Sequence, residues 1–216
     1  MKSTLIFSAL LAGAFTVAHA APPADAKAKA ADPKLAKLVA DSFKPGEGQD
    51  MSRLKQDETQ KACSQHRDNP PAPVAAAITD RETATLKYPA DNKLMGDWKN
   101  GEKLVKAGFA MRIGSIEPDP TAKQKGGNGG NCYACHALDP KEVAAGNIGP
   151  SLTGYGALRG SSDDIVKYTY DKLYNAQATV ACSSMPRLGH NGVLTPEQIA
   201  DVTAYLVSPE SPLNKQ

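Results

Sequence analysis

The amino-acid sequence predicts an all-α fold. Apolar residues recur three and four positions apart along several segments, which is the spacing that places side chains on one face of a helix. No stretch alternates apolar and polar residues for long enough to indicate a strand. Clusters of glycine and proline separate the helical segments and are typical of rigid loops. We therefore expect helices joined by structured loops.

The first 20 residues have the features of a secretory signal peptide. Lys2 supplies the positive start, Leu5 to Val17 the apolar stretch, and Ala18-His19-Ala20 a small-residue cleavage site before Ala21. No cysteine lies near this site, so a lipid anchor has no acceptor, and no later stretch is apolar for long enough to span a bilayer. The sequence thus predicts export to the periplasm, with cleavage after Ala20.

Residues 21–93 are expected to form an N-terminal extension. It begins with a leader rich in Ala, Pro and Lys, which has too few large apolar residues to build a core. Short helices follow: one from Asp32-Pro33 towards Phe43 with Leu35, Leu38 and Val39 at helical spacing, and a polar one from Met51 to about Gln65. The conformation of the segment from Val74 to about Tyr88 stays open.

Residues 94–216 are expected to form the main domain. Its predicted helices run from Asn100 to about Met111, from Ser161 to Tyr174, and from Pro196 to the end signal at Pro209. The last has the clearest start, because Thr195 is suited to cap it and proline is favoured at the first helical position.

The most informative stretch is Cys132-Tyr133-Ala134-Cys135-His136, the pattern of covalent haem c attachment. Two thiols at this spacing can each form a thioether to the haem, and the adjacent histidine binds the iron. We expect one haem c, attached to Cys132 and Cys135, with His136 as the proximal ligand. A redox dithiol, a zinc half-site or a structural disulfide are the alternatives; none requires the trailing histidine, and zinc usually needs a second ligand pair.

The second axial ligand has several candidates: Met185, His190, His66, Met51, Met95 and Met111. Met185 is favoured, because Pro186 restrains the backbone at the ligand and a helix follows shortly after. His190, beside Asn191-Gly192, is interpreted as a solvated turn residue. His190 as ligand and an open or water-bound site remain the alternatives.

His136 also needs a partner for its second ring nitrogen. An iron-bound imidazole usually donates that N–H to a carbonyl or carboxylate. The loop at Gly149-Pro150 is the expected source, with the carbonyl of Pro150 as acceptor. The alternative is that this loop is an ordinary tight turn.

Cys63 and Cys182 remain after the haem motif is assigned. Two spare cysteines in an oxidising compartment usually pair, so we expect a disulfide between them. The alternative is a metal role for Cys63-x-x-His66. The formal net charge of +2 argues against nucleic acid as a partner.

The sequence resembles SoxX, the monohaem c-type subunit of the SoxAX sulfur-oxidation complex. The resemblance covers roughly residues 94–213 and lies in four blocks: Gly130 to His136, Gly146 to Leu152, Met185 to Gly189, and Leu194 to Asp201. The Gly-Asn-Ile-Gly-Pro block is its most specific part. The N-terminal third departs from the short form of that family. The resemblance implies a class I cytochrome c fold, with Met185 as the distal ligand.

The resemblance also implies partners and an activity. The chain would form a heterodimer with a SoxA-like dihaem or monohaem cytochrome, which joins thiosulfate oxidatively to a cysteine of a SoxYZ-like carrier (L-cysteine S-thiosulfotransferase). It would pass the released electrons to an acceptor such as another cytochrome, and none of its own residues would be catalytic. The alternatives are a stand-alone periplasmic carrier, a cytochrome subunit of another dehydrogenase, or a gas sensor or peroxidase with an open distal site.

Overall fold

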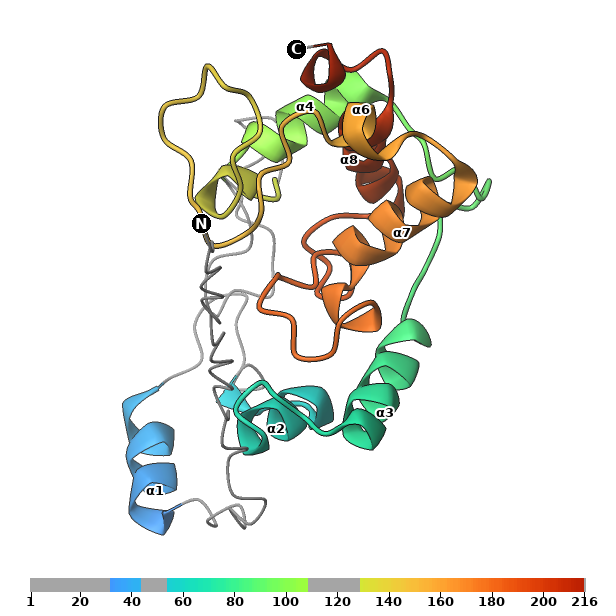
Figure 1. The fold of residues 1–216 in the computed structure, drawn as a ribbon. Helices are drawn as coiled ribbons and strands as arrows, with labels where there is room; N and C mark the ends of the chain where they lie inside the picture. Colours follow the sequence, from blue (N-terminus) through green and yellow to red (C-terminus); the bar gives the residue numbers. More distant parts are fainter. Residues whose placement is uncertain (1–31, 44–53, 109–128, 216) are drawn as a thin grey trace, which may run out of the picture. The chain divides into compact units, whose positions relative to one another are not determined.

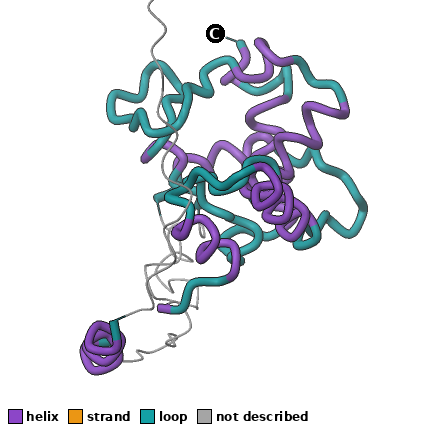
Figure 2. The backbone as a smooth tube through the Cα atoms, turned by 60° about the horizontal axis from the view of Figure 1, so that its bottom comes forward, coloured by secondary structure: helices purple, strands orange, loops and turns teal. Residues whose placement is uncertain are grey.

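The computed structural model describes residues 32–43, 54–108 and 129–215. All regular secondary structure within these ranges is helical, which confirms the predicted all-α class (Figure 2). None of the described helices is both long and apolar enough to cross a membrane. The predicted signal peptide, the leader up to residue 31 and the ligand candidates Met51 and Met111 lie outside the described residues.

The helices are shown in Figure 1. They are α1 (Pro33–Ser42), α2 (Glu58–Gln65), α3 (Ala72–Thr83), α4 (Trp98–Lys106), α6 (Tyr155–Arg159), α7 (Asp163–Tyr174) and α8 (Pro196–Val207), with 3-10 turns η2 (Cys132–Ala134), η3 (Ala176–Ala178) and η4 (Pro212–Asn214).

Helices α4 and α8 cross in close contact within the main domain (Figure 1). Gly101 makes the close approach possible, since a Cβ there would collide with the carbonyl of Asp201 and with Tyr205. The Asp201 carboxylate accepts hydrogen bonds from the Asn100 amide and the Asp97 backbone N–H, both at 2.7 Å. These contacts fix the two helices against each other.

Among the described residues, a large apolar core surrounds this crossing. Helix α7 adds Tyr170, Leu173 and Tyr174, and α8 is buried along most of its length. Of the residues predicted to face inward on α7, Tyr170 is fully buried, whereas Ile165 and Val166 are partly buried at the edge of the core.

Capping side chains decide where the helices begin. Helix α8 has the expected Thr195 cap, completed by Gln198 as a capping box. Helix α2 begins only at Glu58, because Asp57 and Gln60 form a second capping box there; the predicted start at residue 51 is outside the described part. Similarly, Asp97 caps α4 and starts it slightly earlier than predicted.

Two helices were not predicted from the sequence. The segment whose conformation was left open contains α3, which starts directly after Pro71. The short α6 lies between Gly154 and Gly160, which both adopt left-handed φ angles, of 62° and 82°. Such flanking glycines resemble a loop signal in the sequence.

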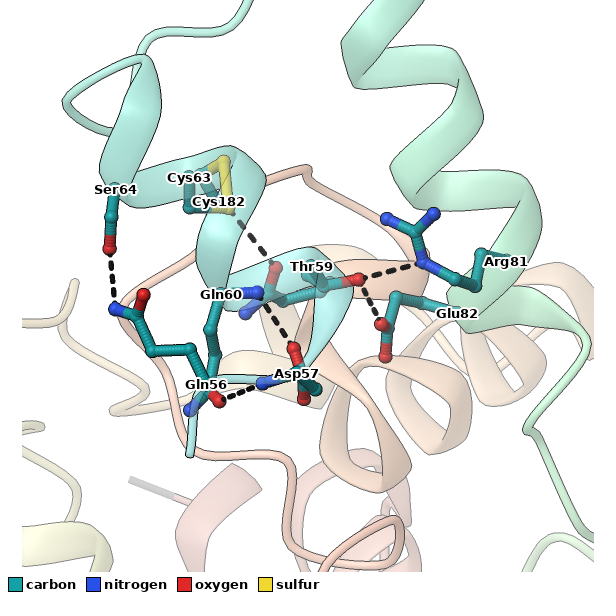
Figure 3. Close-up of a disulfide and its surroundings, with 10 residues drawn as sticks. Gln56, Asp57, Thr59, Gln60, Cys63, Ser64, Arg81, Glu82 and Cys182 are labelled. Atoms are coloured by element: carbon teal, nitrogen blue, oxygen red, sulfur yellow. Dashed lines mark hydrogen bonds between the residues drawn. A yellow bond between two sulfur atoms is a disulfide. The ribbon is translucent and has the colours of Figure 1, made fainter. Parts of the chain in front are cut away.

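The N-terminal extension from residue 54 onwards packs onto the rest of the chain. Residues 31–216 form one compact unit. Cys63 of α2 is joined to Cys182 by a disulfide with a Cα–Cα distance of 5.4 Å (Figure 3). Helix α3 packs against η3. By contrast, α1 has no buried residue.

A buried polar network accompanies the disulfide. Arg187 forms ion pairs with Asp57, at 2.6 Å, and with Glu82, at 3.2 Å. Glu82 also accepts hydrogen bonds from Thr59, shown in Figure 3, and from Asn175, the latter at 2.7 Å. Buried charges are tolerated when they are paired and hydrogen-bonded in this way.

The network keeps both carboxylates ionised. Burial by itself would raise the pKa of Glu82, but the hydrogen bonds from Thr59 and Asn175 and the Arg187 guanidinium outweigh it, and the pKa is lowered. Burial would also raise the pKa of Asp57. The hydrogen bond from the Gln60 backbone and the pairing with Arg187 outweigh this effect, so the pKa of Asp57 is lowered.

We predict that Glu82→Gln lowers the free energy of unfolding by about 3 kcal/mol at pH 7, because it leaves Arg187 buried beside a neutral amide. The matched control is Glu58→Gln, which removes an exposed ion pair with Arg81 and should cost less than about 0.5 kcal/mol. Urea unfolding measures both variants.

The ion pair between Glu82 and Arg187 makes the free energy of unfolding depend on pH. A carboxyl whose pKa is lowered in the folded state stabilises the fold above its unfolded pKa, and this contribution disappears as the pH falls. The difference between wild type and Glu82→Gln should therefore be full above about pH 4.5, the ordinary pKa of glutamic acid, and shrink below it. A difference that stays constant down to pH 3 would contradict the assignment.

Candidate haem-binding site

The Cys132–His136 segment folds into a single tight turn. Its N–H groups at Cys135 and His136 both donate to the Cys132 carbonyl, at 3.1 and 2.9 Å. Asn131 precedes the turn with a left-handed φ of 47°. The turn is tied to α4, because Gly130 donates its N–H to the Leu104 carbonyl at 2.9 Å. The attachment motif is thus anchored to the central helix crossing.

Cys132 and Cys135 are not disulfide-bonded, unlike Cys63 and Cys182. Burial, together with the neighbouring Cys135, raises the pKa of Cys132 to about 12, so it is a neutral thiol at pH 7. Reactive dithiols instead lower the pKa of the attacking thiol. The geometry therefore argues against the redox-dithiol alternative.

Metal sites of the zinc type find little support among the described residues. There, the side chains close enough together to share an ion are Cys63, Asp68 and Cys182. Both sulfur atoms of that group are already bonded in the disulfide, so neither offers a thiolate. This bond also removes the Cys63-x-x-His66 alternative, and His66 itself lies at the C-terminal end of α2.

His136 is oriented by one short hydrogen bond. Its Nδ1 lies 2.7 Å from the Pro150 carbonyl oxygen, the acceptor expected from the sequence. Because a carbonyl only accepts, Nδ1 must bear the proton, and Nε2 is the nitrogen with a lone pair available for a metal. This is the tautomer that an iron ligand requires.

The loop that supplies this carbonyl is itself fixed. Gly149 donates its N–H to the Cys135 carbonyl, and Leu152 donates to the Ala137 carbonyl, both at 2.8 Å. Gly149 lies against the His136 imidazole so closely that an added Cβ would overlap three of its ring atoms. A glycine is needed here for the close approach to the ring, and φ is not in the left-handed range.

These residues fit a haem c. The two thiols are not in a disulfide, and the imidazole has Nε2 available for a metal. Two apolar residues close to the motif in the sequence are also unusually exposed. Ile148, which precedes Gly149, is 79% exposed, and Val143 is 96% exposed. Cys132, Tyr133, Leu152 and Met185 lie partly buried against the main core. Exposed apolar side chains close to the motif in the sequence favour a site for an apolar macrocycle.

Met185 lies in a loop between η3 and α8, partly buried, and packs against the main core. Its N–H donates to the Ser183 hydroxyl at 3.3 Å. Met95 is also partly buried against this core. The assignment of Met185 as the distal ligand stays a prediction.

His190 is not the solvated turn residue that the sequence suggested. It is half-buried, and its Nδ1 lies 3.2 Å from the Thr85 hydroxyl. Burial, with a further contribution from the Arg187 charge, lowers its pKa. The turn is instead held against the N-terminal extension.

Sequence reasoning missed the network around Arg187. Asp57-Glu58-Thr59-Gln60 matches the capping-box pattern and predicts the start of α2, but nothing local indicates that the second carboxylate oxygen of Asp57 binds Arg187. Glu82 and Arg187 are separated by 105 residues. Only the fold brings them together.

Comparisons with known proteins agree with this geometry. The cytochrome c family model matches residues 122–209, a range that contains the attachment motif, the Pro150 loop and Met185. A protein of Aquifex aeolicus (strain VF5), named an uncharacterized lipoprotein, is 41% identical over 221 residues, covering 100% of both chains.

We predict that Gly149→Ala reduces haem incorporation severalfold, because the new methyl group displaces the His136 ring from the Pro150 carbonyl. Gly108→Ala is the matched control, since its Cβ would meet only Asn131, at an ordinary distance of 3.7 Å. The haem-to-protein ratio, from pyridine haemochrome absorbance, measures both. Equal ratios would contradict the close packing of Gly149 on the ring.

Proposed function

This chain belongs to the cytochrome c family, and we propose that it is the electron-transfer subunit of a SoxAX-type complex. The cytochrome c domain makes it a haem electron-transfer protein. The observation that supports the narrower proposal most is the His136–Pro150 hydrogen bond. It assigns a structural role to the Gly-Asn-Ile-Gly-Pro block, the part of the sequence that most specifically resembles SoxX.

Each residue of the site has a defined role in this proposal. Cys132 and Cys135 would attach the haem, His136 would bind iron through Nε2, and Met185 would provide the second ligand. A bound haem c supplies a one-electron couple, whose potential a Met ligand raises. Pro150 keeps the His136 tautomer fixed. With two protein ligands the site leaves no open position for a substrate, which suits a carrier of electrons.

The sulfur chemistry would take place on a SoxA-like partner. There, thiosulfate is joined to a cysteine of a SoxYZ-like carrier, and two electrons are released. The present chain would accept them one at a time and deliver them to another cytochrome. Such a complex requires export to the periplasm. The signal-like sequence supports export, as does the lipoprotein name of the Aquifex aeolicus relative.

Helix α1 is the proposed contact for the SoxA-like subunit. Its apolar residues are exposed, with Leu35 at 56% and Leu38 at 61%, and Phe43 follows at the C-terminal end. Its opposite side has the Lys37–Asp41 ion pair. An amphipathic helix with an uncovered apolar stripe usually buries that stripe on a partner.

We predict that Met185→Ala abolishes the weak far-red charge-transfer band of the ferric protein, lowers the potential and permits carbon monoxide to bind the ferrous iron. Met95→Ala is the control, because Met95 is also partly buried against the core. Absorption spectra and a redox titration test this. An unchanged spectrum in Met185→Ala would move the assignment to His190.

A second experiment tests the complex. The native protein should co-purify with a SoxA-like cytochrome, and the purified pair should couple thiosulfate to the carrier cysteine. Leu35→Glu/Leu38→Glu should weaken association at least about tenfold without changing the haem spectrum, since about 1.4 kcal/mol of lost apolar burial is sufficient. Lys37→Gln, on the opposite side of α1, should bind as wild type does. Purification of the native chain alone would favour a stand-alone carrier.

A further inference from the structure

The loop that contains Met185 is joined to the N-terminal extension on both sides of the methionine. Cys182, three residues before it, is bonded to Cys63 of α2. Arg187, two residues after it, is paired with Asp57 and Glu82. The residues of the extension that make these contacts are 57–85, which we call the clamp, and the loop is residues 182–190.

The disulfide end of the clamp has its own small core. Cys63, Ile78 and Cys182 are buried together, separately from the main core, and Val74 and Ala181 pack against them. A cross-link set in an apolar cluster holds its two segments together even when contacts around it fluctuate. The start of the loop is therefore fixed to α2 and α3.

The other end is fixed by charge. The Arg187 side chain is 8% exposed and that of Glu82 only 4% exposed. Glu82 is held in turn by Thr59 and Asn175, so it cannot follow Arg187 away from its position without losing other hydrogen bonds. Opening the loop would separate a buried ion pair, which is costly. The His190–Thr85 contact adds a third attachment further along.

We propose that the clamp keeps Met185 in place as the iron ligand, and that Arg187 and the Cys63–Cys182 disulfide are positioning residues for it. This inference rests on the proposed function, because it takes Met185 as the distal ligand. A thioether is a neutral ligand, so its occupancy depends on how firmly the chain holds the sulfur near the iron. The clamp supplies that restraint from a segment that haem attachment itself does not use.

The restraint is measurable as the rate at which an external ligand replaces Met185. Imidazole binds ferric iron only after the loop opens, so its limiting binding rate reports the opening. The variants are Arg187→Gln and Cys63→Ser/Cys182→Ser, in the complete haem protein. The control is Tyr88→Phe, which removes a hydroxyl that donates to Asp171 and accepts from Lys167 on α7, both at 3.0 Å, and leaves the loop contacts intact.

We expect both loop variants to bind imidazole at least about tenfold faster than wild type, since about 1.4 kcal/mol removed from the opening free energy gives that factor. Tyr88→Phe should stay within about twofold, as expected for an exposed contact. Each variant should keep its attached haem and its helical circular dichroism. The disulfide can also be broken without a mutation, by treating the folded wild type with a phosphine and then reoxidising the iron. This reduced protein should bind imidazole at the same faster rate.

The outcomes separate the two proposals. A wild-type ferric protein without the far-red Met band would overturn Met185 ligation and the clamp with it. A wild type with the band, combined with wild-type imidazole rates in both variants and in the phosphine-reduced protein, would overturn the clamp alone and leave the electron-transfer function standing.

Discussion

The buried charge of Glu82 needs partners, and satisfying it brings together segments from both ends of the sequence. An unpaired carboxylate in this position would cost several kcal/mol, so the fold supplies Thr59 from α2, Asn175 after α7, and Arg187 from the ligand loop. The last turn of α3 is thereby fixed to the loop that precedes α8. Together with the Cys63–Cys182 disulfide, these contacts join the extension from residue 54 onwards to the main domain, in one compact unit.

The two sides of the proposed iron site are stabilised differently. On the His136 side, hydrogen bonds tie the attachment turn to α4 and to the Pro150 loop, over sequence separations of 26 residues or fewer. On the Met185 side, the restraint comes from long-range contacts with the extension. The proximal side is therefore built within the haem-binding part of the chain, whereas the distal side also depends on the N-terminal extension.

This difference also explains what the sequence predicts well. The all-α class, the cap of α8 at Thr195 and the pairing of Cys63 with Cys182 follow from periodicity, local capping chemistry and the number of spare cysteines. The sequence does not decide the conformation of α3, because this helix is rich in alanine and has little apolar periodicity. The roles of Glu82 and Arg187 depend on a contact between distant residues, which no local pattern encodes. The burial of His190 has the same kind of origin, since Thr85 of the distant extension contacts its ring.

The Cys63–Cys182 bond has a consequence for the order in which the chain matures. In a chain exported N-terminus first, Cys63 emerges before Cys132 and Cys135, and its native partner emerges last of the four. Oxidation during translocation would therefore favour the wrong pairs. In the folded chain, burial raises the pKa of Cys132 and deprives it of the thiolate needed for exchange. Because the turn is tied to α4 and α4 packs against α8, this burial is complete only after the chain beyond Cys182 has folded.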